Sequence, residues 1–268
     1  MTRLPYSLVL ALVFGATPLQ AAGLPDTGQV TCYNDTAADV VPASSAASIA
    51  RDAGTYPGQD CRFGRDAAAT ASALPKTGAG ARGFDYTKVA NNGTLLAAGA
   101  TLGTAATDWA CTLDNVTGLI WEVKTAAGTD PRYFGHTYTW YNSDAATNGG
   151  DAGGTGSNTC NATLPGSLCN TQAFVTAVNL AALCGHSDWR MPTARELFSL
   201  FVADGSNPAI DPTYFLYTPA TSRYWTGSTY VSSADAAFLV DFRSGSIPGG
   251  SKSGDTRYNL RLVRGGPF

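Results

Sequence analysis

The residues best suited to chemistry in this 268-residue chain are its cysteines and histidines, and their spacing does not form a reactive centre. There is no C-x-x-C pair to start a zinc site, and only His136 and His186 could complete one. The sequence has no G-x-S-x-G turn, no P-loop and no G-x-G-x-x-G placed between a strand and a helix. We therefore expect a protein that is not an enzyme, with no catalytic residues, no metal ion and no cofactor.

One loop carries several oxygen-bearing side chains that could in principle hold calcium. Asn142, Asp144, Asn148 and Asp151 lie within a segment rich in Gly, Asn and Thr. Their spacing is not that of an EF-hand, and the closing Glu is missing. We expect a long solvated loop over residues 142–158 rather than a calcium site.

The start of the chain resembles a secretory signal peptide. Arg3 precedes an apolar run at residues 8–14, and small residues lead to a cleavage region after Ala21 or Ala22. The run is too short to cross a bilayer, which needs about 20 apolar residues. We expect residues 1–22 to be removed, and the mature chain to be secreted, periplasmic or on the cell surface without a membrane span.

Export to an oxidising compartment makes disulfides the natural role of the six cysteines. Six cysteines allow about 15 pairings, and the sequence alone does not choose among them. Locality favours Cys32–Cys61 and Cys160–Cys169, which leaves Cys111–Cys184.

The pattern of apolar residues favours an α+β domain. Asn170 can cap a helix whose apolar face carries Phe174 and Val178, and Gly185 would end it. A capping box formed by Thr193 and Glu196 begins a second helix. Strands with antiparallel pairing are expected near residues 84–89, 119–123, 224–229, 238–242 and 258–262. We expect this domain to span residues 82–268. An irregular Ala/Gly/Thr-rich arm at residues 23–81 would precede it, with a linker at residues 66–81 and one disulfide.

Composition and charge narrow the function classes. The chain is 44% hydrophobic and 14% charged with a net charge of −3, which argues against a nucleic-acid binder. Residues 223–264 nevertheless carry a net charge of +3, because Arg223, Arg243, Lys252, Arg257, Arg261 and Arg264 outnumber Asp235, Asp241 and Asp255. Such a segment could form a basic surface that attracts anionic glycans. The alternative is ordinary protection of strand edges by charged residues.

A second group of charged residues surrounds a tryptophan. Asp188, Trp189, Arg190 and Glu196 could form a binding site, but an internal staple explains them better. In that interpretation Trp189 fills the core, while Arg190 forms a fixed ion pair or binds carbonyls at a helix end.

Several segments in a fixed order resemble the Lcl C-terminal domain family. They are Asp114–Glu122 (DNVTGLIWE), Gly185–Leu197 (GHSDWRMPTAREL), Asn207–Asp211 (NPAID) with Tyr214 and Phe215, Tyr224–Ser228 (YWTGS) and Val263–Gly266 (VRGG). This bacterial family consists of exported proteins, largely uncharacterised, and is named for the end domain of a collagen-like adhesin. The resemblance covers about residues 82–268.

The resemblance implies a C-type-lectin-like fold related to that of formylglycine-generating enzymes, and binding rather than catalysis. In that fold the ligand face is built from long loops and late strands, here about residues 203–257. The chain lacks collagen repeats, which departs from the named adhesin. It also lacks the Glu-Pro-Asn and Trp-Asn-Asp signatures of calcium-dependent sugar-binding lectins.

We therefore expect a secreted or cell-surface adhesion module that recognises glycans or protein surfaces, with exposed Tyr and Trp for stacking and Arg for anionic groups. A homo-oligomer is compatible with this role, and nucleic acid is not an expected partner. The alternatives are a structural component of a bacterial envelope or surface assembly, and an enzyme of the formylglycine-generating type with reactive cysteines. The candidate ligand-binding residues flank strands near loops and are Tyr217, Arg223, Tyr230, Arg243, Lys252 and Arg257.

Overall fold

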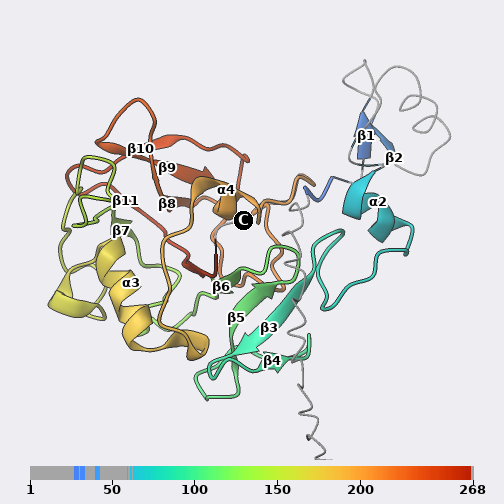
Figure 1. Ribbon diagram of the computed structural model, residues 1–268, viewed down its shortest axis with the longest axis horizontal. Coiled ribbons are helices and arrows are strands. Elements are labelled where there is room, and N and C mark those ends of the chain that lie inside the picture. Colours follow the sequence, from blue (N-terminus) through green and yellow to red (C-terminus); the bar gives the residue numbers. More distant parts are fainter. Residues whose placement is uncertain are drawn as a thin grey trace, which may run out of the picture.

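The computed structural model of the chain describes residues 27–29, 31–33, 40–42, 59, 61 and 63–266 (Figure 1). The expected signal peptide at residues 1–22 lies outside the described residues, as does much of the expected arm. Within the part that the structure describes, no helix has both the length and the apolar character needed to cross a membrane.

The architecture is α+β, with short helices and antiparallel sheets. A five-stranded sheet has the order β12-β6-β5-β3-β4, from Val263–Arg264, Ile120–Glu122, Trp109–Asp114, Tyr86–Ala90 and Leu95–Leu96. A three-stranded sheet has the order β10-β9-β8, from Gly249–Ser251, Ala236–Asp241 and Arg223–Thr229. Two smaller sheets pair β11 (Arg257–Tyr258) with β7 (Tyr138–Thr139) and β1 (Thr31–Tyr33) with β2 (Val40–Pro42). In Figure 1 the three-stranded sheet lies above the five-stranded sheet, with α4 beside its strands.

Two of the helices begin where the sequence predicts, whereas the helix at Gly64–Thr70 falls in the segment expected as an irregular arm and linker. The α-helices are α2 (Gly64–Thr70), α3 (Thr171–Leu180) and α4 (Ala194–Phe198), and the 3-10 turns are η1 (Pro165–Ser167) and η2 (Leu183–Gly185). The Asn170 side chain accepts a hydrogen bond from the Ala173 amide at 2.8 Å, which caps α3. Thr193 and Glu196 form the expected capping box at α4. Helix α3 ends earlier than predicted, because Ala182 already adopts a left-handed conformation with φ 47°.

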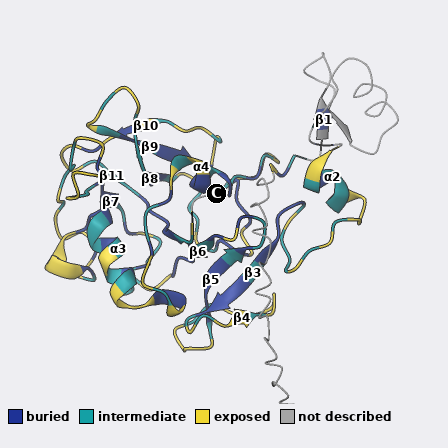
Figure 2. Ribbon diagram, viewed as in Figure 1, coloured by how far each residue is buried: buried dark blue, intermediate teal, exposed yellow. Residues whose placement is uncertain are grey.

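Two clusters of buried side chains form the core. One gathers around α3 and includes Phe174, and the other includes Tyr86 and Phe215. In Figure 2 much of β3 and β9 is drawn in the dark blue of buried residues. All five tryptophans belong to the interior, since none exceeds 2% exposure: Trp109, Trp121, Trp140, Trp189 and Trp225. The expectation of exposed tryptophans for ligand stacking is therefore wrong; burying these large apolar rings stabilises the fold instead.

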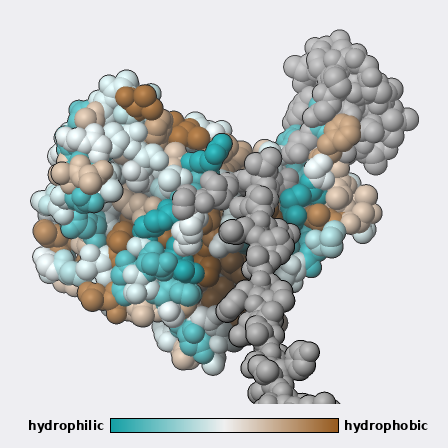
Figure 3. All heavy atoms as spheres, in the orientation of Figure 1, coloured by the Kyte–Doolittle hydropathy of each residue, from teal (hydrophilic) through white to brown (hydrophobic). Residues whose placement is uncertain are grey.

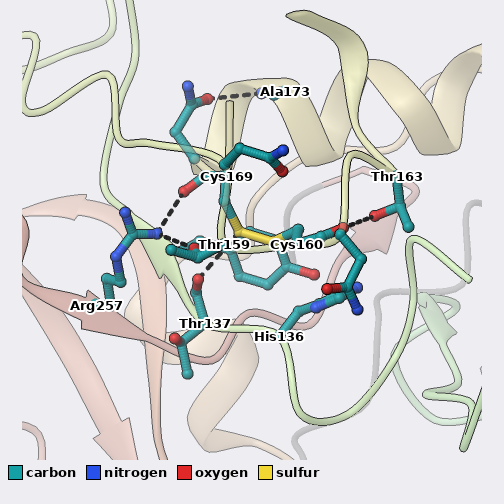
Figure 4. The surroundings of a disulfide bond; sticks show 12 residues. His136, Thr137, Thr159, Cys160, Thr163, Cys169, Ala173 and Arg257 are labelled. Carbon is teal, nitrogen blue, oxygen red and sulfur yellow. Dashed lines mark hydrogen bonds between the residues drawn. A yellow bond between two sulfur atoms is a disulfide. The ribbon is translucent and has the colours of Figure 1, made fainter. Parts of the chain in front are cut away.

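The described residues form three disulfides, two of them inside the core cluster around α3, and all three join the pairs that locality favours. Cys111–Cys184 links β5 to η2 across 73 residues of sequence, and Cys32–Cys61 links β1 to the segment before α2. Cys160–Cys169 closes a short loop ahead of α3, where Figure 4 shows it beside Arg257. No free cysteine occurs in the described part of the chain.

Residues 66–81, expected as a linker, are instead fixed to the rest of the fold. Their first part belongs to α2. The Asp85 carboxylate accepts hydrogen bonds from the amides of Thr77 and Gly78, both at 2.8 Å, and Asp211 accepts one from the Ala81 amide at 3.0 Å. Buried carboxylates thus hold a segment whose own composition offers little apolar surface.

The last predicted strand is also different, because residues 258–262 cross between two sheets. Tyr258 pairs with β7, and Val263 pairs with β6. Between them the Asn259 amide donates to the Arg223 carbonyl, and its side chain donates to the Phe134 carbonyl. Asn259 therefore turns the chain from one sheet toward the other while Leu260 and Leu262 stay buried.

Candidate functional site

The six ligand-binding candidates from the sequence do not form one site. Tyr217 is 44% exposed and stacks on Phe134, with ring centres 5.7 Å apart. Tyr230, which follows β8 directly, packs against Phe238 with ring centres 4.8 Å apart. Tyr217 is thus the more accessible of the two aromatic candidates.

The two candidate arginines on β8 and after β9 share one carboxylate. Arg223 lies 3.2 Å from Asp241 and Arg243 lies 4.0 Å from the same oxygen. Burial pushes the pKa of Asp241 upward, but the Arg243 amide and the Arg223 guanidinium outweigh this effect and hold the pKa below its ordinary value. Asp241 therefore stays ionised and offsets much of the charge of these two side chains.

Arg257 is occupied by the loop that precedes α3. Its guanidinium donates to the Cys169 carbonyl at 3.2 Å and to the hydroxyls of Thr159 and Ser157, and it pairs with Asp255 (Figure 4). These bonds fix the disulfide loop, so Arg257 acts mainly as an internal support.

Lys252 is not a surface residue at all. The side chain is 1% exposed, and its ammonium donates to the Asn148 carbonyl at 2.8 Å and to the Thr229 hydroxyl at 3.0 Å. It also lies 4.0 Å from the centre of the Trp140 ring. The prediction that Lys252 contacts a ligand at the surface is wrong, because this cation anchors the loop at residues 142–151 to the three-stranded sheet.

The expected basic surface over residues 223–264 is consequently weak. Arg264 forms two hydrogen bonds with Asp188, and Arg261 is fully buried and donates to the Glu122 carbonyl. Most cations of this segment are paired or buried, so attraction of anionic ligands from a distance is small. The partner acid lies opposite in the sheet for Arg223, two residues away for Arg243 and Arg257, and 76 residues away for Arg264.

The residues around Trp189 form an internal staple at the end of β12. Arg190 makes two hydrogen bonds with Glu196, at 2.8 and 2.6 Å, and donates to the Gly265 carbonyl at 3.1 Å. Burial opposes ionisation of Glu196, but hydrogen bonds from Arg190 and the Thr193 amide keep its pKa below the ordinary value. Asp188 takes no part in the pair of Arg190 and Glu196, because its carboxylate binds Arg264 instead.

One open cleft, with a volume of about 340 Å³, lies between α3, the end of β7 and β8. This size falls within the range of small-molecule sites, which are about 300–1,000 Å³. Sequence reasoning noted its aromatic residues and its loop but did not combine them with α3. The lining residues are Trp140, Tyr141, Asn142, Thr147, Gln172, Val175, Arg190, Met191 and Gly227.

The polar rim of this cleft is held in place by its own loop. The Asn142 side chain donates to the Thr147 hydroxyl at 2.9 Å, and the Gln172 side chain accepts from the Ser143 amide at 2.7 Å. Gly153 closes the loop against Trp140, where an added Cβ would lie 2.1 Å from the Trp140 carbonyl oxygen. The cleft is therefore largely preformed.

The oxygen-rich side chains of this loop satisfy backbone groups nearby. Asp144 accepts from the Ala146 amide at 3.0 Å, Asn148 from the Gly150 amide at 2.9 Å and Asp151 from the Gly153 amide at 2.7 Å. These are turns in which Asn and Asp bind the backbone two residues on. In the described ranges of the chain, no group of three metal-ligating side chains lies together.

Apart from Arg190, the side chains that line the cleft are uncharged. The charge of Arg190 faces the Glu196 carboxylate. The remaining rim consists of amides and hydroxyls, and Val175, Met191 and Tyr141 supply apolar surface. Such a site can accept and donate hydrogen bonds to a neutral ligand while covering one apolar face of it.

Comparison with known families places this cleft inside a matched region. Residues 110–264 match the family model of the Lcl C-terminal domain. The chain belongs to the Lcl C-terminal domain family. All lining residues of the cleft, from Trp140 to Gly227, fall within the Lcl-type region, whereas β3 and β4 precede it. Comparisons with curated proteins and with solved structures find no match.

Proposed function

We propose that this Lcl-type protein is a non-catalytic binding module of the cell surface or the secreted fraction, and that its cleft takes a sugar unit of a neutral glycan. The observation that carries this proposal is the composition of the cleft. An apolar wall stands beside a rim of amides and hydroxyls, and the only cation there is paired.

A sugar ring matches this arrangement chemically. One face of a pyranose presents C–H groups that pack on aromatic and aliphatic surface, while its edge presents hydroxyls. Asn142, Thr147 and Gln172 provide donors and acceptors at the rim, and Tyr141 and Val175 provide apolar surface. A charged glycan would gain little, because Glu196 balances Arg190.

The disulfides support a location outside the cytoplasm. Three disulfides, including the 73-residue link between Cys111 and Cys184, are typical of proteins that fold in an oxidising compartment. They fit the secretory signal inferred at residues 1–22. A rigid frame of this kind suits a module whose loops recognise a ligand.

A glycan array with the native protein tests the proposal. We expect hits among neutral glycans whose binding is unchanged between low and high salt, since no net charge contributes. Val175→Trp, which fills the cleft from α3, should abolish these hits. Thr176→Trp lies on the exposed side of the same helix and should retain them.

Three outcomes would contradict the proposal. They are hits confined to sulfated glycans and lost at high salt, equal binding by both variants, and no glycan binding together with recovery of a protein partner by cross-linking. The last result would favour a structural component of a surface assembly. A titration that found free thiols in the native protein would revive the enzymatic alternative with reactive cysteines.

A further inference from the structure

Three of the four lysines are buried, and one of them differs from the others in its charge environment. Lys124 lies 3.1 Å from the Glu122 carboxylate. The carboxylates of Asp151 and Asp235 act on Lys252. Lys88 is only 6% exposed, yet it forms no ion pair with any described residue.

The immediate partners of Lys88 are neutral. Its ammonium donates to the Ala100 carbonyl at 2.7 Å and lies 4.0 Å from the centre of the Trp109 ring and 5.9 Å from that of Tyr214. An ammonium has three N–H donors, so one carbonyl and one ring face leave capacity for a further acceptor. Burial alone lowers the pKa of Lys88, as expected for a cation without a nearby carboxylate.

A cavity adjoins this lysine. It has a volume of about 230 Å³ and is lined by Lys88 together with Thr77, Tyr86, Thr87, Leu96 and Tyr214. It lies between β3, β4 and the segment that the Asp85 carboxylate holds in place. A buried charge without a counter-charge is costly, and an anion in an adjoining cavity would offset part of that cost.

We propose that this cavity binds a small carboxylate whose anionic group pairs with the Lys88 ammonium. A singly charged ligand fits better than a phosphate, because the carboxylates of Asp85 and Asp211 act on the Tyr214 side of the cavity. Both carboxylates are already engaged by backbone amides and stay in place. Tyr86, Leu96 and Tyr214 would surround the apolar part of the ligand.

This site is separate from the cleft at Trp140. Its strands β3 and β4 lie before the Lcl-type region, whereas Tyr214, which also lines the cavity, lies within it. It also does not depend on the proposed glycan function, because no residue lines both sites.

The test uses the full chain with isotope-labelled lysine and NMR detection of the side-chain signals. Sodium acetate is the probe, sodium chloride at equal ionic strength controls for salt, and acetamide controls for shape without charge. We expect acetate to shift the Lys88 signal with saturation and to leave Lys124 and Lys252 unchanged. A linear shift identical to that of chloride, or equal saturation by acetamide, would refute the proposal.

Two matched variants locate the binding. Lys88→Met keeps the length of the side chain without its charge, and should weaken acetate binding at least tenfold, as read from amide signals of β3 and β4. Lys252→Met removes the other lysine that lies 4.0 Å from a tryptophan ring and should bind acetate normally. Unchanged acetate binding by Lys88→Met would overturn the assignment. If Lys88→Met does not fold, the titration of the native chain decides alone.

Val175→Trp should retain acetate binding even where glycan binding is lost, which separates this inference from the proposed function.

Discussion

The buried pair formed by Glu122 and Lys124 should make the stability of the protein rise with pH in the alkaline range. Both side chains are almost fully inaccessible, and the Lys124 ammonium lies 4.4 Å from the centre of the Phe174 ring. Burial, together with the nearby Arg261 and Arg132, lowers the pKa of Lys124 from 10.5 to about 8 despite the attraction of Glu122.

The sign follows from proton binding. Between a folded pKa of about 8 and the ordinary value of 10.5, the unfolded chain holds the Lys124 proton and the folded chain releases it. The free energy of unfolding therefore increases with pH across this window. The total is about 3 kcal/mol for a shift of this size, of which about 2 kcal/mol is gained between about pH 7 and 9.5.

The assay is urea unfolding of the disulfide-intact protein at several pH values up to about 9.5, which stays below the range in which the tyrosines titrate. In Lys124→Met, the increase in the free energy of unfolding over this pH range should be smaller by about 2 kcal/mol than in the native protein. Arg195→Met, which removes an exposed cation, should keep the full increase in the free energy of unfolding. An identical pH dependence in native protein and Lys124→Met would refute the reasoning.

Three further perturbations test the frame around the cleft. The double variant Cys111→Ala/Cys184→Ala removes a disulfide that spans 73 residues of sequence, and it should lower the free energy of unfolding in urea by about 4 kcal/mol, because the unfolded chain gains conformational entropy. A decrease below about 1 kcal/mol would contradict this explanation. Glu196→Gln should destabilise the fold by about 2 kcal/mol, because it weakens both the capping box and the pair with Arg190. The pKa of Glu196 is lowered in the folded protein, so the stabilisation that its carboxylate provides should disappear as the pH falls below the ordinary value of 4.5. If the native protein and Glu196→Gln unfold alike in acid, this prediction is wrong. Gly153→Ala should detach the loop at residues 142–151 from Trp140 and increase its proteolysis, while Gly254→Ala, whose added Cβ meets nothing, serves as the control for a glycine with positive φ.

The parts of the fold that the sequence predicts are those fixed by neighbours in sequence. Asn170 caps α3 through an amide three residues later, and Thr193 with Glu196 forms a capping box over the same spacing. Cys160 and Cys169 pair across nine residues. Each of these interactions depends on local geometry, so it can be inferred without knowing how distant segments meet.

The candidate site was predicted less well because its contacts are long-range. Lys252 looks like a surface cation in sequence, yet it binds the Asn148 carbonyl, which lies 104 residues away. Arg264 meets Asp188 across 76 residues. A local count of charges over residues 223–264 cannot anticipate such partners, and it therefore predicts a basic surface that the pairing largely removes.

The same pairing bears on what this Lcl-type protein can recognise. Only 14% of the residues are charged, and many of these charges are used inside the fold, as in Lys124 with Glu122 and Arg190 with Glu196. The face in Figure 3 accordingly shows pale and teal residues with brown ones in small groups. A surface of hydroxyls and amides discriminates ligands by the geometry of short hydrogen bonds and by apolar contact, and hardly by charge.

Binding through the cleft at Trp140 should therefore depend on the stereochemistry of a neutral ligand. An epimer that differs at one hydroxyl should bind more weakly than the preferred sugar, and equal affinity for both epimers would show that the rim formed by Asn142, Thr147 and Gln172 is not the contact surface.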